Sequence, residues 1–301
     1  MDLREELQQI GNHDQPLAKQ HLKMLSDLDT AGSRIFAETW PHIPGERRIE
    51  VAETLVDLAE DNIDLDYRQV FLLCLDDPEA AVRTIAVSGL WEDDRLTTLR
   101  RILGLLDDPS GSVREAAVLF LGHAAYRAEM GELPEEETRA VCTALLDATS
   151  DPEQPIDVRR RAVEGIGYLS ELPEAQAKIG RAYAHAEQLM RESAVVAMGR
   201  SMQRAWFPYI ERELHSISPA MRYEAARAVG ELGEEGRDLQ EGLLPLVDDD
   251  DSEVSQAAIW ALGQIGGQHA RRVLQRLARS QDDVRSQAAQ DALEELTFDE
   301  L

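Results

Sequence analysis

The stretch SEVSQAAIWALGQIG, residues 252–266, decides the fold of this chain. Small and aliphatic residues recur in it at helical spacing, at Val254, Ala258 and Leu262, so they form one stripe along a helix. Gly263 follows the last of them and adds a second small residue beside the stripe. The segment therefore predicts a helix whose buried side is small enough to let a neighbouring helix approach closely.

Copies of this helix recur along most of the chain. When the copies are aligned on their first apolar residue, they open at Val82, Val113, Val158, Met190, Met221, Val254 and Val284. All seven have alanine four residues later, six have arginine at the next position, and five have glycine nine residues later. Self-similarity at a nearly fixed interval, roughly thirty residues, is the signature of a repeat array.

Each copy is preceded by a turn signal and by another amphipathic segment. Several turns contain Asp-Pro or Ser-Pro, which is typical of a helix start: Asp77-Pro78, Asp108-Pro109, Asp151-Pro152 and Ser218-Pro219. The preceding segments are residues 96–106, 136–148, 175–184, 206–214, 239–247 and 270–278. The unit is thus helix, turn, helix, and the longest interval between copies predicts an inserted loop at residues 127–137.

The pattern Asp-Pro-x-x-x-Val-Arg-x-x-Ala-x-x-x-Leu-Gly resembles the HEAT-repeat family, in particular the bacterial HEAT-like repeats also found in phycobilin lyase subunits. The resemblance covers residues 67–296 and implies an all-α fold, a right-handed α-solenoid of stacked antiparallel helix pairs. We expect residues 1–65 to form divergent capping helices and residues 66–301 to form one continuous array of about seven helix pairs.

The same resemblance implies a ladder of aspartates and arginines along the stack. The matching residues are Asp77, Asp108 and Asp151 with Arg83, Arg114 and Arg159. Ser255 replaces arginine in one copy and is expected to interrupt the ladder.

The charge of the chain limits its partners. With 58 acidic and 31 basic residues the formal net charge is −27, which disfavours sequence-independent binding to nucleic acid or to an anionic membrane. The sequence shows neither a signal peptide nor a membrane-spanning run, so it predicts a cytoplasmic protein, and we expect a monomer. Cys74 and Cys142 lie in apolar runs and are interpreted as free thiols with no disulfide or zinc spacing.

No catalytic motif accompanies the repeats. The seven histidines show no metal-binding spacing, and phosphate-binding glycine loops are absent from the sequence. Deoxyhypusine hydroxylase, an enzyme family with similar repeats, binds iron through His-Glu dipeptides, and the sequence has none. We therefore expect no catalytic residue, no metal and no cofactor, and predict that the protein is not an enzyme.

A binding surface is predicted from the residues that lie two, six and ten positions after each opening residue. These positions share one face of the second helix, and the resemblance to HEAT solenoids places that face on the concave side. Between Arg160 and Gln264 this face has three arginines and three glutamates, so it is neutral, and it carries aromatic residues. Aromatic residues beside arginine are typical of interaction hot spots.

The predicted partner-binding residues, called the aromatic row below, are Arg160, Tyr168, Arg200, Tyr223, Arg227, Trp260 and Gln264. Two functions follow. The first is a non-catalytic scaffold or adaptor that binds a partner protein along this row. The alternative is a lyase-like or chaperone-like subunit that acts on a cofactor-bearing partner protein. The aromatic rings could also merely pack between helices, and the row would be wrong if Tyr223 and Trp260 were fully buried.

Overall fold

The structure, a computed structural model, describes residues 3–298 and divides them into two compact units. The first unit comprises the described residues up to Ala124, with Glu135–Glu137 and Glu153–Val158. The second comprises Ala125–Pro134, Thr138–Pro152 and the described residues from Arg159 onward. The predicted division at residue 65 lies inside the first unit and stays a prediction about where the regular repeats begin.

The described residues form eighteen α-helices and no strand, which confirms the all-α prediction. The first unit contains α1 (Leu3–Ile10), α2 (Lys19–Leu22), α3 (Thr30–Thr39), α4 (Gly45–Asp61), α5 (Arg68–Cys74), α6 (Ala80–Gly89) and α7 (Leu96–Gly104). Three helices have residues in both units: α8 (Gly111–Glu129), α9 (Glu135–Ser150) and α10 (Ile156–Ile166).

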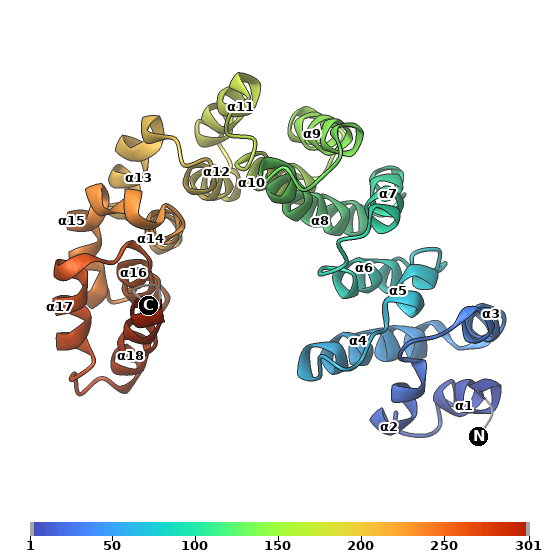
Figure 1. Cartoon of the computed structure of the whole chain (residues 1–301). Coiled ribbons are helices and arrows are strands. Elements are labelled where there is room, and N and C mark those ends of the chain that lie inside the picture. Colours follow the sequence, from blue (N-terminus) through green and yellow to red (C-terminus); the bar gives the residue numbers. More distant parts are fainter. Residues whose placement is uncertain (1–2, 299–301) are drawn as a thin grey trace. The chain divides into compact units, whose positions relative to one another are not determined.

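The second unit continues with α11 (Pro173–Tyr183), α12 (Gln188–Arg200), α13 (Phe207–Leu214), α14 (Pro219–Glu231), α15 (Gln240–Leu243), α16 (Ser252–Ile265), α17 (Gly267–Leu277) and α18 (Asp283–Phe298). Helices α12, α14, α16 and α18 pack against one another in sequence order. Helix α11 packs on α12, α13 on α14 and α17 on α18, so the second unit is a stack of helix pairs (Figure 1).

The buried stripe and the glycine column, that is, the glycines nine residues after the opening residues of five copies, explain this stacking. Val254, Ala258 and Leu262 are at most 1% exposed, as their spacing predicts. A Cβ atom added to Gly199 of α12 would lie 2.8 Å from the Cα of Ala228 in α14. Such a distance is below van der Waals contact, so glycine is required where successive second helices approach each other.

The last copy differs from the pattern. Val284, its opening residue, is 54% exposed, whereas Val254 is 1% exposed. In α18 the most deeply buried alanine is Ala289 rather than Ala288, which is half-buried. The apolar register of the other copies is therefore not kept in α18, the last helix of the described residues.

Two expected elements have a different form. Residues 239–247, expected as one amphipathic helix, consist of a short α15 between two 3₁₀ segments, 233–239 and 244–248. Pro245 lacks an N–H donor and Gly233 has a φ of 53°, which both disfavour a continuous α-helix. The inserted loop expected at residues 127–137 is mostly helical, because α8 extends to Glu129 and α9 starts at Glu135.

Two of the Asp-Pro pairs, at Asp77 and Asp108, make turns rather than direct helix caps. The Asp77 carboxylate accepts a hydrogen bond from the backbone N–H of Glu79 at 2.8 Å, and α6 starts only at Ala80. The Asp108 carboxylate accepts one from the backbone N–H of Ser110 at 2.8 Å in the same way. An aspartate that bonds the backbone two residues ahead forms an Asx-turn, which holds the chain for the helix that follows.

Arginine–aspartate pairs of the ladder that the resemblance implies are present in each unit. The aspartate of each pair comes from the repeat that follows the arginine, not from the arginine's own repeat. Arg83 donates from Nε and Nη2 to both carboxylate oxygens of Asp108, each at 2.8 Å. Arg222 does the same with Asp249, at 2.7 and 2.8 Å. Arg83 and Arg222 therefore bond the aspartate of the following repeat, whereas the expected ladder member Arg114 donates from Nε to the Oε1 of Gln154 at 2.8 Å. Buried Ser255 takes the arginine position in the next copy, where it donates to the carbonyl of Val247 at 2.8 Å.

Candidate protein-interaction surface

The centre of the aromatic row lies on α14 and α16. Tyr223 and Arg227 are four residues apart on α14 and therefore share one face. The guanidinium of Arg227 lies 4.0 Å from the ring centroid of Trp260 on α16, a cation–π contact. A Cβ atom at Gly230 would lie 2.2 Å from the Trp260 ring. The glycine of one repeat thus makes the space in which the indole of the next repeat lies.

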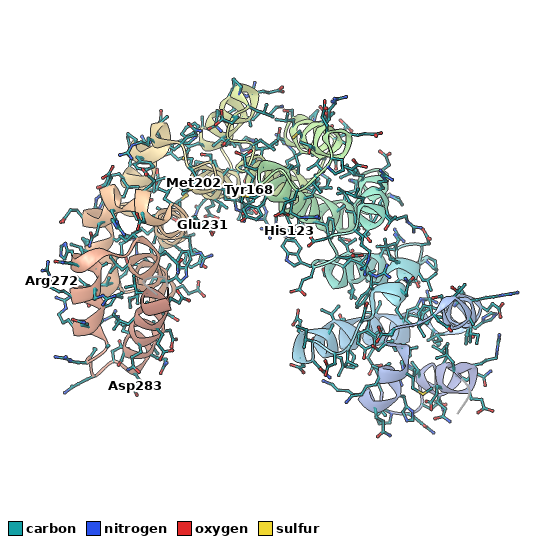
Figure 2. The ribbon with its side chains drawn as sticks, viewed as in Figure 1. His123, Tyr168, Met202, Glu231, Arg272 and Asp283 are labelled. Atoms are coloured by element: carbon teal, nitrogen blue, oxygen red, sulfur yellow. The ribbon has the colours of Figure 1, made fainter. Side chains whose placement is uncertain are left out.

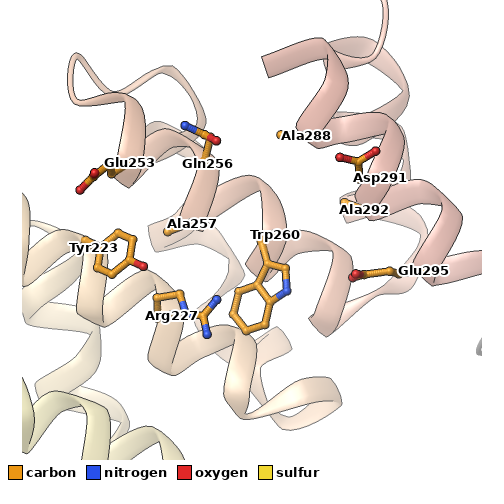
Figure 3. Close-up of a pocket in the computed structure, with 10 residues that line it drawn as sticks. All are labelled: Tyr223, Arg227, Glu253, Gln256, Ala257, Trp260, Ala288, Asp291, Ala292 and Glu295. Atoms are coloured by element: carbon orange, nitrogen blue, oxygen red, sulfur yellow. The ribbon is translucent and has the colours of Figure 1, made fainter. Parts of the chain in front are cut away.

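These three side chains line a groove of about 620 Å³ on the second unit (Figure 3). The remaining lining residues come from α16 and α18: Glu253, Gln256, Ala257, Ala288, Asp291, Ala292 and Glu295. Tyr223 and Trp260 are both half-buried. Their rings are therefore partly accessible, and the condition that would have excluded the row, full burial of both, is not met.

A second groove, of about 380 Å³, lies beside the first and shares Tyr223 and Arg227 with it. Its other lining residues come from α10, α12 and α14: Arg160, Arg161, Glu164, Leu189, Glu192, Ser193, Val196, Arg200, Glu224, Ala228 and Glu231. Its apolar lining consists of Leu189, which is exposed, Val196 and Ala228. The two grooves together extend over five successive second helices, α10, α12, α14, α16 and α18.

The other aromatic member of the row belongs to a second cluster. The guanidinium of Arg200 lies 5.1 Å from the ring centroid of Tyr168, and Tyr126 contacts the same ring edge-on at 5.3 Å between centroids. Burial raises the pKa of the Tyr168 hydroxyl, so it is neutral at physiological pH. In Figure 2, Tyr168 and Glu231 lie on the side of the second unit opposite to Arg272 on α17.

The two ends of the row are engaged in polar contacts. Arg160 forms an ion pair with Glu164 one turn further along α10, at 3.6 Å. Gln264 donates to Glu295 of α18 at 2.7 Å. The structure thus brings all seven row residues onto one unit, with Tyr168 and Trp260 contacted by arginines and the two ends of the row contacted by carboxylates. Their role in binding stays a prediction.

Sequence reasoning missed Glu224, which lines the second groove. Burial and the neighbouring carboxylates of Glu164 and Glu192 raise the pKa of its side chain to about 7. Glu224 lies three residues after Met221, one position beside the row, where five of the other six copies have an uncharged residue. This charge, at a repeat position that is uncharged in most copies, is the sequence feature that could have identified Glu224 as a candidate site residue.

The predicted free thiols show no sign of activation. Cys74 is buried, and desolvation raises the pKa of its thiol well above the ordinary range. Desolvation also raises the pKa of the Cys142 thiol. A thiol with a raised pKa is a poor nucleophile because little thiolate is present.

Residues 3–298 contain no candidate metal centre and no candidate membrane span. Among residues 3–298 no three His, Cys, Asp or Glu side chains are grouped so that they could hold a metal ion. Within the same residues, no helix combines the length and the apolar character needed to cross a bilayer.

Comparison with known proteins supports the fold. Residues 207–294 match the family described as HEAT repeats. No curated protein matches the sequence. Among solved structures, the chain is similar to the complex of CpcE and CpcF of phycocyanin lyase from Nostoc sp. PCC7120, at 17% identity and a TM-score of 0.56, with 78% of this chain and 88% of that chain covered.

The chain is also similar to a Kap121p mutant, at 15% identity and a TM-score of 0.53. That match covers 93% of this chain and 36% of the Kap121p chain. Both likenesses are low in identity and concern the fold alone, a stack of helix pairs such as protein-interaction scaffolds typically have. The repeat pattern, the helix stacking and the match of residues 207–294 to HEAT repeats agree on a fold of HEAT-like helix pairs.

Proposed function

We propose that the protein is a non-catalytic scaffold or adaptor that binds a partner protein along the aromatic row. The observation that carries the proposal is the contact between Arg227 and Trp260, which presents a partly accessible indole in the first groove. Arg227 itself lines both grooves. A tryptophan that is already fixed by stacking loses little conformational freedom when it binds, so it is well suited as an anchor.

The charges of the grooves indicate the chemistry of the partner. The first groove has Arg227 against the carboxylates of Glu253, Asp291 and Glu295, so its rim is acidic. The second groove has four arginines and four glutamates and is balanced. A partner segment that places an apolar side chain against Trp260 and basic side chains beside the α18 carboxylates would be complementary. The net charge of −27 would also speed its association.

The test is affinity capture with matched variants. The chain with Tyr223→Ala and Trp260→Ala is compared with the unchanged chain and with Trp91→Ala, because Trp91 is also exposed but lies outside the row. We expect the double variant to lose specific partners that the Trp91→Ala control retains. The same set of captured proteins for all three chains would refute the assignment of the surface.

The lyase-like or chaperone-like alternative has support only from the likeness in fold to the phycocyanin lyase complex. It predicts that captured partners carry a covalently attached cofactor, which absorbance and mass spectrometry of the captured fraction would detect. The raised pKa values of both thiols give this alternative no nucleophile on cysteine. We therefore favour the scaffold.

A further inference from the structure

A basic pocket lies outside the aromatic row, on the second unit. It encloses about 250 Å³ between the end of α9, α10, α11 and the turn before α12. Its polar lining is Thr149, Ser150, Arg159, Lys178, Arg181 and His185, and its apolar lining is Val163, Ala182 and Met190. No carboxylate lines this pocket, although the chain has 58 acidic residues and 31 basic ones.

At this pocket, one arginine of the ladder lacks an acidic partner. In the second unit, Arg222 holds the carboxylate of Asp249, which lies five residues before the opening residue Val254 of the next copy. The corresponding partner of Arg159 is the residue five before Met190, which is His185. A histidine cannot accept two parallel hydrogen bonds from a guanidinium, so this rung has no protein anion.

Arg159 is accordingly without a partner. Its Nε is buried, and among residues 3–298 its guanidinium has no hydrogen-bond or ion-pair partner. An unpaired, partly buried guanidinium is costly, since desolvation is not offset by an opposite charge. The atoms Nε and Nη2, which bind carboxylate oxygens in Arg222, are therefore suited to bind an external oxyanion at Arg159.

The other lining groups add donors from different directions. Lys178, only 9% exposed, donates to the hydroxyl of Ser150 at 2.5 Å. The Nδ1 of His185 accepts the backbone N–H of Glu187 at 3.0 Å, so a neutral ring keeps its proton on Nε2 as a donor. The carboxylate of Glu174, which is exposed and does not line the pocket, lies 3.5 Å from the ammonium of Lys178.

We propose that this pocket binds a phosphate group. A carboxylate is planar and its two oxygens would be satisfied by the Arg159 fork alone. The pocket supplies Arg159, Lys178, Arg181 and a His185 donor from three segments of the chain, which suits a tetrahedral oxyanion with two negative charges. The group could belong to a free small phosphate or to a phosphorylated side chain, and its binding does not depend on the proposed function of the aromatic row.

Calorimetric titration of the full chain with inorganic phosphate, at ionic strength held constant with chloride, tests this proposal. We expect saturable binding that Arg159→Gln weakens by about tenfold or more, because two charge-assisted hydrogen bonds are lost. The matched control is Arg279→Gln, which removes the charge of an exposed arginine elsewhere on the second unit. Binding that is absent in the unchanged chain, or equal in all three proteins, would overturn the proposal.

A second variant guards against misfolding of Arg159→Gln. His185→Asp restores the acid of the ladder beside Arg159, so it is expected to raise the unfolding midpoint without phosphate and to abolish the phosphate-induced rise in that midpoint. A His185→Asp chain that phosphate stabilises as much as the unchanged chain contradicts the site. Titration with a phosphoserine peptide distinguishes the two sources: tighter binding than inorganic phosphate assigns the pocket to a phosphorylated protein, and weaker binding assigns it to a free phosphate.

Discussion

Replacing Gly199 by alanine tests whether close helix approach holds the repeats together. Gly199 lies near the end of α12, and its added Cβ would be 2.8 Å from the Cα, 2.9 Å from the Cβ and 3.1 Å from the carbonyl oxygen of Ala228. All three atoms are fixed by the backbone of α14, so no flexible side chain can turn away. To accept the methyl group, α12 and α14 must separate.

The magnitude follows from two opposing effects. Alanine is favoured over glycine inside a helix by about 1 kcal/mol. Overpacking a well-packed contact costs about 1–3 kcal/mol, and a contact with backbone lies toward the upper end. We therefore expect Gly199→Ala to lower the free energy of unfolding by about 1–2 kcal/mol.

Gly180→Ala is the matched control in the same unit. Gly180 lies near the end of α11, and its added Cβ would be 3.5 Å from Trp206, an ordinary contact. Only the helix preference then remains, so this variant should raise the free energy of unfolding by about 0.5–1 kcal/mol. Urea unfolding followed by circular dichroism measures both changes. If Gly199→Ala is as stable as Gly180→Ala, the role assigned to the glycine column is wrong.

Two further predictions concern charge. Because the pKa of Glu224 is raised in the folded chain, the folded state keeps the carboxyl proton to higher pH than the unfolded state does, and the free energy of unfolding falls as pH rises from about 4.5 to about 7. Glu224→Gln should abolish this fall. We expect the variant to match the unchanged chain at pH 4 and to exceed it by up to about 3 kcal/mol at pH 8, measured from urea midpoints; parallel pH profiles would contradict this. Asp249→Asn should cost about 2 kcal/mol at pH 7, because it breaks the bidentate pair with Arg222. The Arg222 guanidinium holds the pKa of Asp249 below its usual range, so the cost should disappear as pH falls below that lowered pKa, and a cost independent of pH would refute the pairing.

The sequence predicts the repeat unit well because its signals are local and periodic. The opening residue, the alanine four later and the glycine nine later identify the second helices, since helical spacing alone determines which residues share a face. The first helices are predicted less well. Residues 239–247 have the right apolar spacing, but Pro245 and the nearby glycines favour 3₁₀ geometry, which periodicity does not report.

The candidate surface, too, is predicted in part from the sequence and in part visible only in the structure. The row residues follow from register, and the structure adds which of them touch, for example Arg227 on Trp260. The ladder shows what spacing alone misses. Arg83 bonds Asp108 of the next repeat, so the partner of each arginine depends on how successive repeats are stacked. The unpaired Arg159 is a consequence of that pairing and could not be recognised from its own repeat.

Trp260 is proposed to anchor a partner protein, so the decisive measurement is the dissociation constant of one captured, purified partner. Isothermal titration would compare the unchanged chain with Trp260→Ala and with Trp91→Ala. A hot-spot tryptophan contributes about 2 kcal/mol or more, so we predict at least about thirtyfold weaker binding for Trp260→Ala and unchanged binding for Trp91→Ala. Equal dissociation constants for all three chains would contradict the account.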